Sequence, residues 1–192
     1  VDGVHGFGAV DTDVTGLGCD FLTSGTHKWL FGPRGTGLLW SRAWDAVAPL
    51  IPSFSFPRGP EPQGPGMAAT PGGFHSYEHR WALAEAFTFH TGIGRDRIAA
   101  RIRDQATRLK EGLAGVGSVT VVTPKDPELS AGLVMCRVAA LSPREAVDRL
   151  RAEHRVVASV TPYDDPLLRF GTSIVTTPEQ VDQAVKAVAA IV

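Results

Sequence analysis

The sequence predicts an α/β protein that ends in a smaller α+β unit. Short apolar runs bounded by glycine and serine fill the first 44 residues, as expected for strands covered on both faces. Later in the chain, apolar residues recur at helical steps of three and four, and beyond residue 117 strand-like and helical patterns alternate. We expect four regions: part of a larger sheet domain (1–48), a loop rich in proline and glycine (49–75), connecting helices (76–116) and a C-terminal α+β domain (117–192).

The first two strands are predicted at "CDFLTSG" (19–25) and "GTGLLWS" (35–41), with a turn between them that contains Lys28. After them, the stretch from Pro49 to Gly73 cannot propagate a helix or a central strand, because proline and glycine recur throughout it. Loops of this length are usually functional or disordered. We expect this one to separate the sheet region from the helices.

The helical pattern runs from Ile98 to Val116, and the charged residues between its apolar positions, Lys110 among them, are expected to form a solvated face. Two later helices begin at "SPRE" and "TPEQ", where Ser142 and Thr177 can each form a capping box with a proline at the first helical position. The C-terminal order is therefore β-β-α-β-β-α. Its four strands are predicted at 118–124, 131–141, 155–163 and 167–175.

The composition is that of a soluble globular protein: 43% of the 192 residues are hydrophobic and 20% are charged. A formal net charge of −1 and a pI of about 6.6 give no electrostatic reason to expect nucleic acid or an anionic membrane as a partner. No apolar run approaches the roughly 20 residues of a membrane span. Cys19 and Cys136 lie in apolar runs, so we expect buried free thiols and a reducing, cytoplasmic location.

Lys28 stands out among the polar residues because it lies between His27 and Trp29, just after the small residues of "TSGT" (23–26). Partial desolvation at such a position would lower the pKa of the ammonium group and favour the neutral, nucleophilic amine. An amine of this kind can form a Schiff base with an aldehyde. Because most lysines near glycine turns are exposed, an ordinary surface lysine is the alternative interpretation.

Asp2 follows an apolar residue at what looks like the end of a strand, and ligands bind at the carboxyl ends of strands in α/β sheets. A pyridoxal phosphate enzyme needs a lysine for the cofactor aldehyde and an acidic side chain for the protonated pyridine nitrogen. Asp2 and Lys28, 26 residues apart, provide both groups. Hydroxyl and imidazole donors for a phosphate group are present at Ser24, Thr26 and His27.

Residues 1–40, "VDGVHGFGAVDTDVTGLGCDFLTSGTHKWLFGPRGTGLLW", resemble the cofactor segment of the class V aminotransferases, which are fold-type I pyridoxal phosphate enzymes. The resemblance is strongest to the branch of isopenicillin N epimerases and C–S lyases, which reads Asp-x-x-His and then H-K-W-L-x-G-P-[KR]-G-x-G. It implies the C-terminal half of such an enzyme: the end of the large-domain mixed sheet, followed by the small α+β domain. It also implies that Asp2 contacts the pyridine nitrogen, that His5 lies near the ring hydroxyl and that Lys28 forms the internal aldimine. The implied phosphate ligands are Ser24, Thr26 and His27, and which of the two hydroxyls binds the phosphate stays open.

Two later motifs extend the resemblance. "ATPGG" (69–73) is similar to the loop by which one subunit of the family reaches the phosphate of its neighbour, which implies a homodimer and a phosphate contact from Thr70. "LLRFGTSIVTTPEQVD" (167–182) is similar to the family's C-terminal segment, in which an arginine grips the substrate α-carboxylate. Arg169 is the residue implied for that role.

The resemblance also shows what these residues lack. Family members are much longer, and their N-terminal half carries a glycine-rich phosphate loop and the side chain that stacks on the cofactor ring. This sequence has neither, and it begins without a methionine in what looks like a strand, so we expect a fragment or one half of a larger assembly. The expected partners are an amino-acid substrate and either a second copy or a different chain that supplies the N-terminal half. Alone, the chain is expected to bind the cofactor weakly or not at all.

The expected function is that of a pyridoxal phosphate enzyme acting on an α-amino acid. Transamination, epimerisation and elimination, including C–S cleavage, all remain open, because they differ only in the fate of the carbanion that the ring holds. A cysteine desulfurase needs a mobile, exposed cysteine, and neither Cys19 nor Cys136 has that setting. A non-catalytic or regulatory half-subunit is the alternative.

A zinc hydrolase is a more remote alternative. "HSYEH" (75–79) fits the pattern H-x-x-E-H, in which His75 and His79 would bind zinc and Glu78 would act as the base, with Glu85 a conceivable third ligand. Ser76 is a plausible N-cap, so His75 is expected to precede the first helical turn. The structural interpretation of this segment is a helix with Trp81, Ala84 and Phe87 facing the core.

Overall fold

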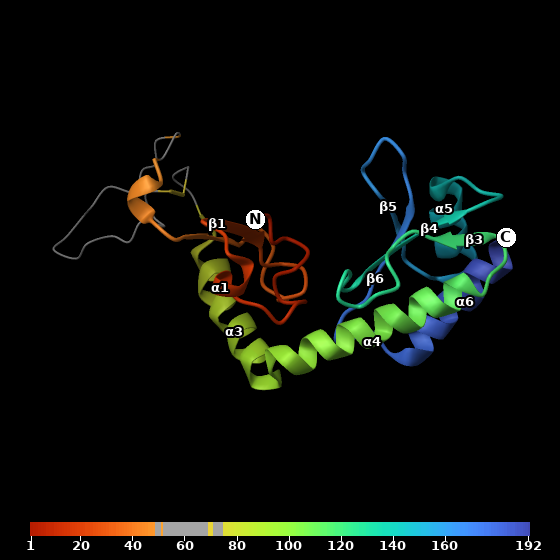
Figure 1. Cartoon of the computed structure of the whole chain (residues 1–192), viewed down its shortest axis with the longest axis horizontal. Helices are drawn as coiled ribbons and strands as arrows, with labels where there is room; N and C mark the ends of the chain where they lie inside the picture. The colour runs from red at the N-terminus through yellow and green to blue at the C-terminus, as the bar shows by residue number, and fades with distance from the viewer. Residues whose placement is uncertain (49–50, 52–68, 71–74) are drawn as a thin grey trace. The chain divides into compact units, whose positions relative to one another are not determined.

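The computed structural model describes residues 1–48, 51, 69–70 and 75–192. They form two compact units, Val1–Gly94 and Arg95–Val192 (Figure 1). The units divide inside the region expected as connecting helices, so each unit contains one of its helices. Most of the expected loop lies outside the described residues.

The N-terminal unit is built on the strands β1 (Phe21–Gly25) and β2 (Gly37–Ser41), which pair antiparallel. The first residues of the chain run parallel to β1, with Asp2 opposite Thr23 in an isolated bridge. The Thr23 N–H donates to the Val1 carbonyl oxygen, and the Gly3 N–H donates to the Thr23 carbonyl oxygen. One strand with a parallel and an antiparallel neighbour makes a mixed sheet, as predicted. The unit also contains α1 (Val14–Leu17), the 3₁₀ helix η1 (Trp44–Ala46) and α3 (Tyr77–Ile93).

Helix α3 differs from the sequence-based expectation. The prediction puts Trp81, Ala84 and Phe87 in the core, but all three are exposed among the described residues, Trp81 by 74%. The buried side chains of α3 are instead Ala86 and His90. Apolar residues occur on several sides of this helix, so their spacing does not identify the side that meets the unit. That prediction is therefore wrong.

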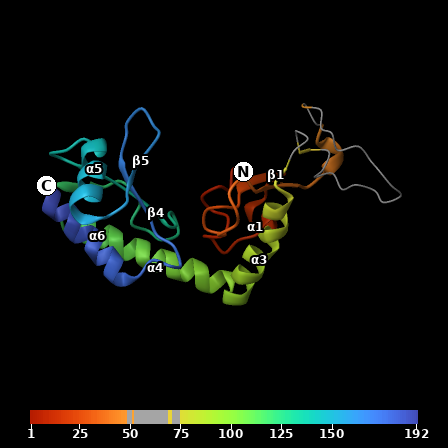
Figure 2. The same ribbon diagram turned by 180° about the vertical axis from the view of Figure 1, so that it is seen from behind.

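The C-terminal unit contains a four-stranded antiparallel sheet in the order β3-β4-β6-β5. Behind one face of this sheet, helix α6 packs along α4 (Figures 1 and 2). After α4, the chain order is β-β-α-β-β-α, which confirms the predicted arrangement. The elements are α4 (Arg95–Ala114), β3 (Val119–Val121), β4 (Leu133–Val138), α5 (Pro143–His154), β5 (Ser159–Val160), β6 (Leu168–Gly171) and α6 (Pro178–Ile191).

Alternate side chains of this sheet face a core shared with the three helices. Val134, Cys136 and Leu168 are buried there among apolar side chains of α4, α5 and α6. Because successive side chains of a strand point to opposite faces, Met135 and Arg169 lie on the other face of the sheet. The helix-covered face therefore stabilises the unit, and the opposite face carries both apolar and polar side chains, with Met135 and Arg169 half-buried on it.

Both predicted capping boxes are present. The Ser142 hydroxyl accepts the Glu145 N–H at the start of α5, and the Glu145 carboxylate accepts the Ser142 N–H in return. Thr177 and Gln180 make the same exchange at the start of α6. Each exchange satisfies backbone N–H groups that the helix itself leaves without a partner.

Lys110 requires a second correction, because it belongs to the face of α4 expected to be solvated and yet is only 3% exposed. Its Nζ donates to the carbonyl oxygens of Pro124 and Lys125 and to the hydroxyl of Ser130, at 2.9 to 3.0 Å. Burial lowers the pKa of this ammonium group. The amine therefore ties the loop after β3 to the helix, which a pattern of charged residues alone does not indicate.

Cys19 and Cys136 are free and buried, as predicted. Burial raises the pKa of the Cys136 thiol to about 11, because the apolar core disfavours the thiolate. Within the ranges that the structure describes, no helix combines the length and the apolar character needed to cross a bilayer.

Candidate active site

A closed turn carries Lys28 from the end of β1 to the start of β2. The Gly32 N–H donates to the Thr26 carbonyl oxygen (2.8 Å), and the Thr26 N–H donates to the Thr36 carbonyl oxygen (3.2 Å). A Cβ at Gly32 would lie 2.9 Å from that Thr26 oxygen, so a larger residue would open the turn. Phe31 has a φ of 62°, in the left-handed region that side chains rarely adopt. The backbone on both sides of Lys28 is thus fixed.

The side chain of Thr26 belongs to this turn. Thr26 is fully buried, and its hydroxyl donates to the Thr36 hydroxyl, because the Thr36 hydroxyl itself donates to the carbonyl oxygen of Pro33 (2.6 Å). Its position therefore favours a role in holding the turn over the expected contact with a phosphate. The other two expected phosphate donors differ in setting: Ser24 is buried and donates to the neighbouring carbonyl oxygen at 2.9 Å, whereas His27 is exposed.

The amine of Lys28 lies beside an imidazole. Lys28 is half-buried, and its Nζ is 3.3 Å from Nε2 of His5, whose ring stands edge-on to the indole of Trp29 with 5.7 Å between centroids. Trp29 is buried, and its carbonyl oxygen accepts the Nε2–H of His90 at 2.7 Å. His90 thus anchors the residue next to the lysine. Nothing in the sequence around His90 indicates this contact, because its partner lies 61 positions away.

The segment that carries Asp2 and His5 packs directly on the lysine turn. Oδ1 of Asp2 accepts the N–H of Val4 (2.9 Å) and so begins a compact turn of its own. Gly8 has a φ of 82°, and a Cβ there would lie 2.6 Å from the backbone nitrogen of Leu30. Only glycine allows this approach. The N-terminal unit therefore holds the predicted acid and imidazole together with the predicted lysine.

Arg169 and Thr70 are the two predicted site residues outside residues 1–40. Arg169 lies on β6 of the C-terminal unit, where its Nε donates to the hydroxyl of Ser159 (3.0 Å). Thr70 is half-buried, and the rest of its motif, 71–73, lies outside the described residues. The roles expected for both residues stay predictions.

The histidines of the zinc motif have other surroundings. His75 precedes α3, and its ring stands edge-on to Tyr77, whereas Nδ1 of His79 donates to the carbonyl oxygen of Arg34 (3.1 Å). Hydrogen bonds from the backbone and from Ser76 lower the pKa of Glu78, as suits an acidic residue in the first helical turn. In the part of the chain that the structure describes, no three His, Cys, Asp or Glu side chains are grouped to hold a metal ion.

Comparison with known proteins places these features in a family. A family model described as aminotransferase class V matches residues 1–160. An isopenicillin N epimerase of Streptomyces clavuligerus is 32% identical over all of this chain and 52% of the relative. The apo cysteine desulfurase of Thermococcus onnurineus NA1 superposes with a TM-score of 0.86 at 21% identity, over 100% of this chain and 51% of that one. A C-DES mutant with glycine covalently linked to its PLP cofactor superposes with a TM-score of 0.84 at 23% identity, over 96% of this chain and 49% of that one.

The chain thus spans about half the length of the relatives it matches. The solved structures confirm the predicted α/β fold class, since they match both units over nearly the whole chain. The family model confirms the resemblance seen in residues 1–40 and extends it well into the C-terminal unit. The chain belongs to the class V aminotransferase family.

Proposed function

We propose that this protein is a pyridoxal phosphate-dependent enzyme that acts on an α-amino acid, with Lys28 as the residue that binds the cofactor covalently. The observation that carries the proposal is the half-buried amine of Lys28, 3.3 Å from Nε2 of His5 on a closed turn. Membership of the class V aminotransferase family supports it, and so does the PLP cofactor named for the C-DES relative.

The donor set of the N-terminal unit fits this cofactor. When bound, pyridoxal phosphate supplies an aldehyde that reacts with a primary amine and a ring that draws electrons from the substrate α-carbon. Asp2 would hold the pyridine nitrogen with its carboxylate, and His5 would lie at the ring hydroxyl. His27 would hold the phosphate as an exposed donor just after β1, and Ser24 would join it by turning its hydroxyl away from the Gly25 carbonyl oxygen.

Lys28 would also move the proton at the substrate α-carbon. A primary amine released beside that carbon is a suitable base, and the neighbouring imidazole of His5 can exchange a proton with it at hydrogen-bond range. Removal of the α-proton is the step common to transamination, epimerisation and elimination. Arg169 would bind the α-carboxylate of the substrate. We propose this shared step, which the epimerase name of the Streptomyces relative also supports.

We further propose that the working enzyme is an assembly. The similarity of "ATPGG" (69–73) to the loop by which one subunit of the family reaches its neighbour's phosphate supports a homodimer that uses Thr70. A different chain that supplies the N-terminal half is the other partner that the sequence predicts.

The decisive experiment is covalent trapping of the cofactor. Pyridoxal phosphate added to the protein, with any chain that co-purifies, is expected to give a new visible absorption band and, after borohydride reduction, a mass adduct on the peptide that contains Lys28. Lys28→Ala is expected to abolish both, while Lys125→Ala, which removes an exposed amine in the other unit, keeps both. An adduct on another lysine, or none, would overturn the proposal and favour a non-catalytic half-subunit.

A further inference from the structure

Arg169 occupies a defined place on the open face of the C-terminal sheet. Its neighbours in the strand, Leu168 and Phe170, are buried in the core under the helices, so the arginine points to the opposite face. The strand register sets Ser159 of β5 directly beside it on one side and Met135 of β4 on the other. Arg169 is half-buried between them. The sheet therefore fixes where the side chain starts and what lies next to it.

The hydroxyl of Ser159 contacts Arg169 twice. It accepts the Nε–H of the guanidinium at 3.0 Å and donates to the Arg169 carbonyl oxygen at 3.5 Å. Ser159 lies opposite Arg169 in the antiparallel pairing of β5 with β6, so the register of these two strands determines where the hydroxyl lies. One serine thus restrains both the backbone and the head group of the same arginine.

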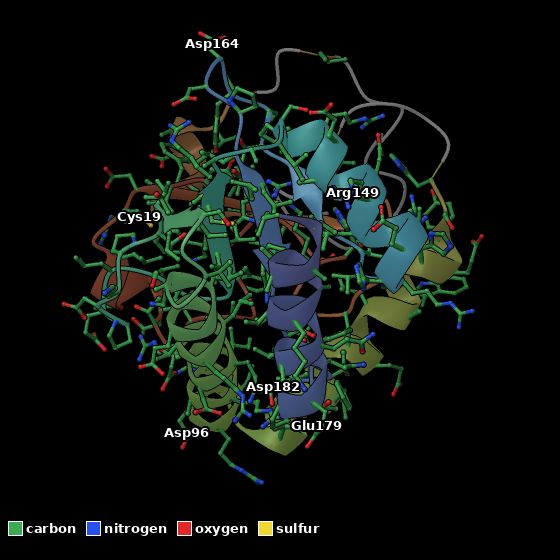
Figure 3. All side chains as sticks on the ribbon, turned by 90° about the vertical axis from the view of Figure 1, so that its right-hand side faces the viewer. Cys19, Asp96, Arg149, Asp164, Glu179 and Asp182 are labelled. Atoms are coloured by element: carbon green, nitrogen blue, oxygen red, sulfur yellow. The ribbon has the colours of Figure 1, made fainter. Side chains whose placement is uncertain are left out.

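Several other arginines of the unit have anionic partners, although not all of them do. Arg108 pairs with Asp182 through two nitrogens, and Arg149 pairs with Glu153 on α5, while Arg137 pairs with Asp165. Figure 3 labels Arg149 on α5 and Asp182 on α6, on the helical side of the unit. No carboxylate among the described residues forms an ion pair with Arg169. Its partner is a neutral hydroxyl, so its positive charge is left for an anion from outside the unit.

We propose that Ser159 is a positioning residue for substrate binding, an inference that rests on the function proposed above. By engaging Nε, Ser159 leaves Nη1 and Nη2 as the two donors that face outward, so a substrate carboxylate is bound end-on by the terminal fork. Holding one long side chain in one orientation also removes rotamer freedom before the substrate arrives, which strengthens binding without a direct contact. Ser159 itself touches neither substrate nor cofactor.

The test compares two ligands that differ only in the carboxylate. L-alanine and ethylamine are titrated into the cofactor-loaded protein, with any co-purifying chain, and binding is followed by the change in cofactor absorption. Ser159→Ala is expected to weaken L-alanine about 10-fold, the effect typical of losing one hydrogen bond to a charged group, and to leave ethylamine unchanged. Ser159→Thr keeps the hydroxyl and is expected to restore L-alanine binding.

A second readout needs no cofactor. In protein labelled with ¹⁵N-arginine, the Nε–H signal of Arg169, assigned by its loss in Arg169→Lys, is expected to exchange slowly with solvent in the native chain and rapidly in Ser159→Ala. Equal weakening of both ligands, or no weakening of L-alanine, would overturn the role of Ser159 while leaving the covalent role of Lys28 intact. A protein without a Lys28-dependent absorption band would instead overturn the proposed function, and the positioning role with it.

Discussion

Each of the two units withdraws one lysine from solvent, and the two amines are used differently. Lys110, in the C-terminal unit, is almost fully buried, and three oxygen acceptors take up its three donors. Lys28, in the N-terminal unit, is half-buried, and its Nζ lies 3.3 Å from Nε2 of His5. All three N–H donors of the Lys110 ammonium group have oxygen acceptors, whereas Lys28 lies beside an imidazole that can exchange a proton with it.

The difference shows that burial alone does not identify a reactive lysine. Carbonyl oxygens stabilise the ammonium form and hold it in one place, which suits a structural tie. A reactive amine must instead be able to lose its proton and reach a ligand, so its surroundings must leave it incompletely engaged. The same contrast separates Thr26, whose hydroxyl is used inside its turn, from the exposed His27 next to it.

The largest expected effect comes from removing the amine of Lys110. Lys110→Met leaves two carbonyl oxygens and a hydroxyl without their donor, so we expect the free energy of unfolding of the C-terminal unit to fall by about 3 kcal/mol. Urea unfolding followed by far-UV circular dichroism measures it. All four tryptophans lie in the N-terminal unit, so tryptophan fluorescence should report a nearly unchanged transition.

Lys28→Met is the matched control for that experiment. It removes an amine whose N–H donors are not all bonded to oxygen acceptors. The free energy of unfolding of each unit is therefore expected to stay within about 0.5 kcal/mol of the native value. A loss of stability at Lys28 equal to that at Lys110 would contradict the distinction between a structural and a reactive lysine.

A smaller expected effect is a pH dependence of stability, which tests whether the core of the C-terminal unit keeps water away from the Cys136 thiol. The Cys136 thiol has a pKa of about 11 in the folded chain against 9.0 as the ordinary value. Between these pH values the unfolded state releases the proton and the folded state keeps it, so stability falls as pH rises, by about 1.4 kcal/mol per pH unit and about 2.7 kcal/mol in all. Below pH 9 the thiol contributes no pH dependence.

The thiol's contribution is isolated by subtraction, because lysines and tyrosines also titrate in this range. Unfolding curves of the native chain and of Cys136→Ala are compared at pH 8 and pH 10.5, and the native chain should lose more stability over that interval. Parallel losses in the two proteins would show that the thiol does not titrate in the core.

Sequence patterns predicted best where the cause is local. The capping boxes at Ser142 and Thr177 depend on residues three positions apart, and both formed as predicted. The exposure of Trp81 and the burial of Lys110 were missed, because each depends on what lies across from a helix face. A charged residue between apolar ones is usually solvated, and only the loop that folds back over α4 reverses this for Lys110.

The candidate site divides in the same way. The lysine and its neighbours form one motif that can be identified in the sequence, and the family match agrees with it. The anchor from His90 to the Trp29 carbonyl oxygen joins positions 61 apart and depends on the packing of α3 against the turn. The Ser159 contact depends on strand register, which a two-residue strand cannot reveal in advance.

The smallest expected effect distinguishes a turn residue from a ligand residue within the Lys28 motif. Thr26→Val keeps the shape of the side chain but removes the hydroxyl bonded to Thr36, so we expect the N-terminal unit to lose about 1 kcal/mol, measured by tryptophan fluorescence during urea unfolding. His27→Ala removes an exposed ring and should not change that transition measurably.

Cofactor affinity should show the reverse order. His27→Ala is expected to weaken pyridoxal phosphate about 10-fold, as for the loss of one charge-assisted hydrogen bond to phosphate, whereas Thr26→Val should bind it nearly as the native chain does. Titration with pyridoxal phosphate, followed by the visible absorption band that depends on Lys28, measures both. If Thr26→Val instead lost cofactor affinity without losing stability, the hydroxyl would belong to the phosphate site, as the family resemblance first implied, and its bond to Thr36 would describe the cofactor-free chain only.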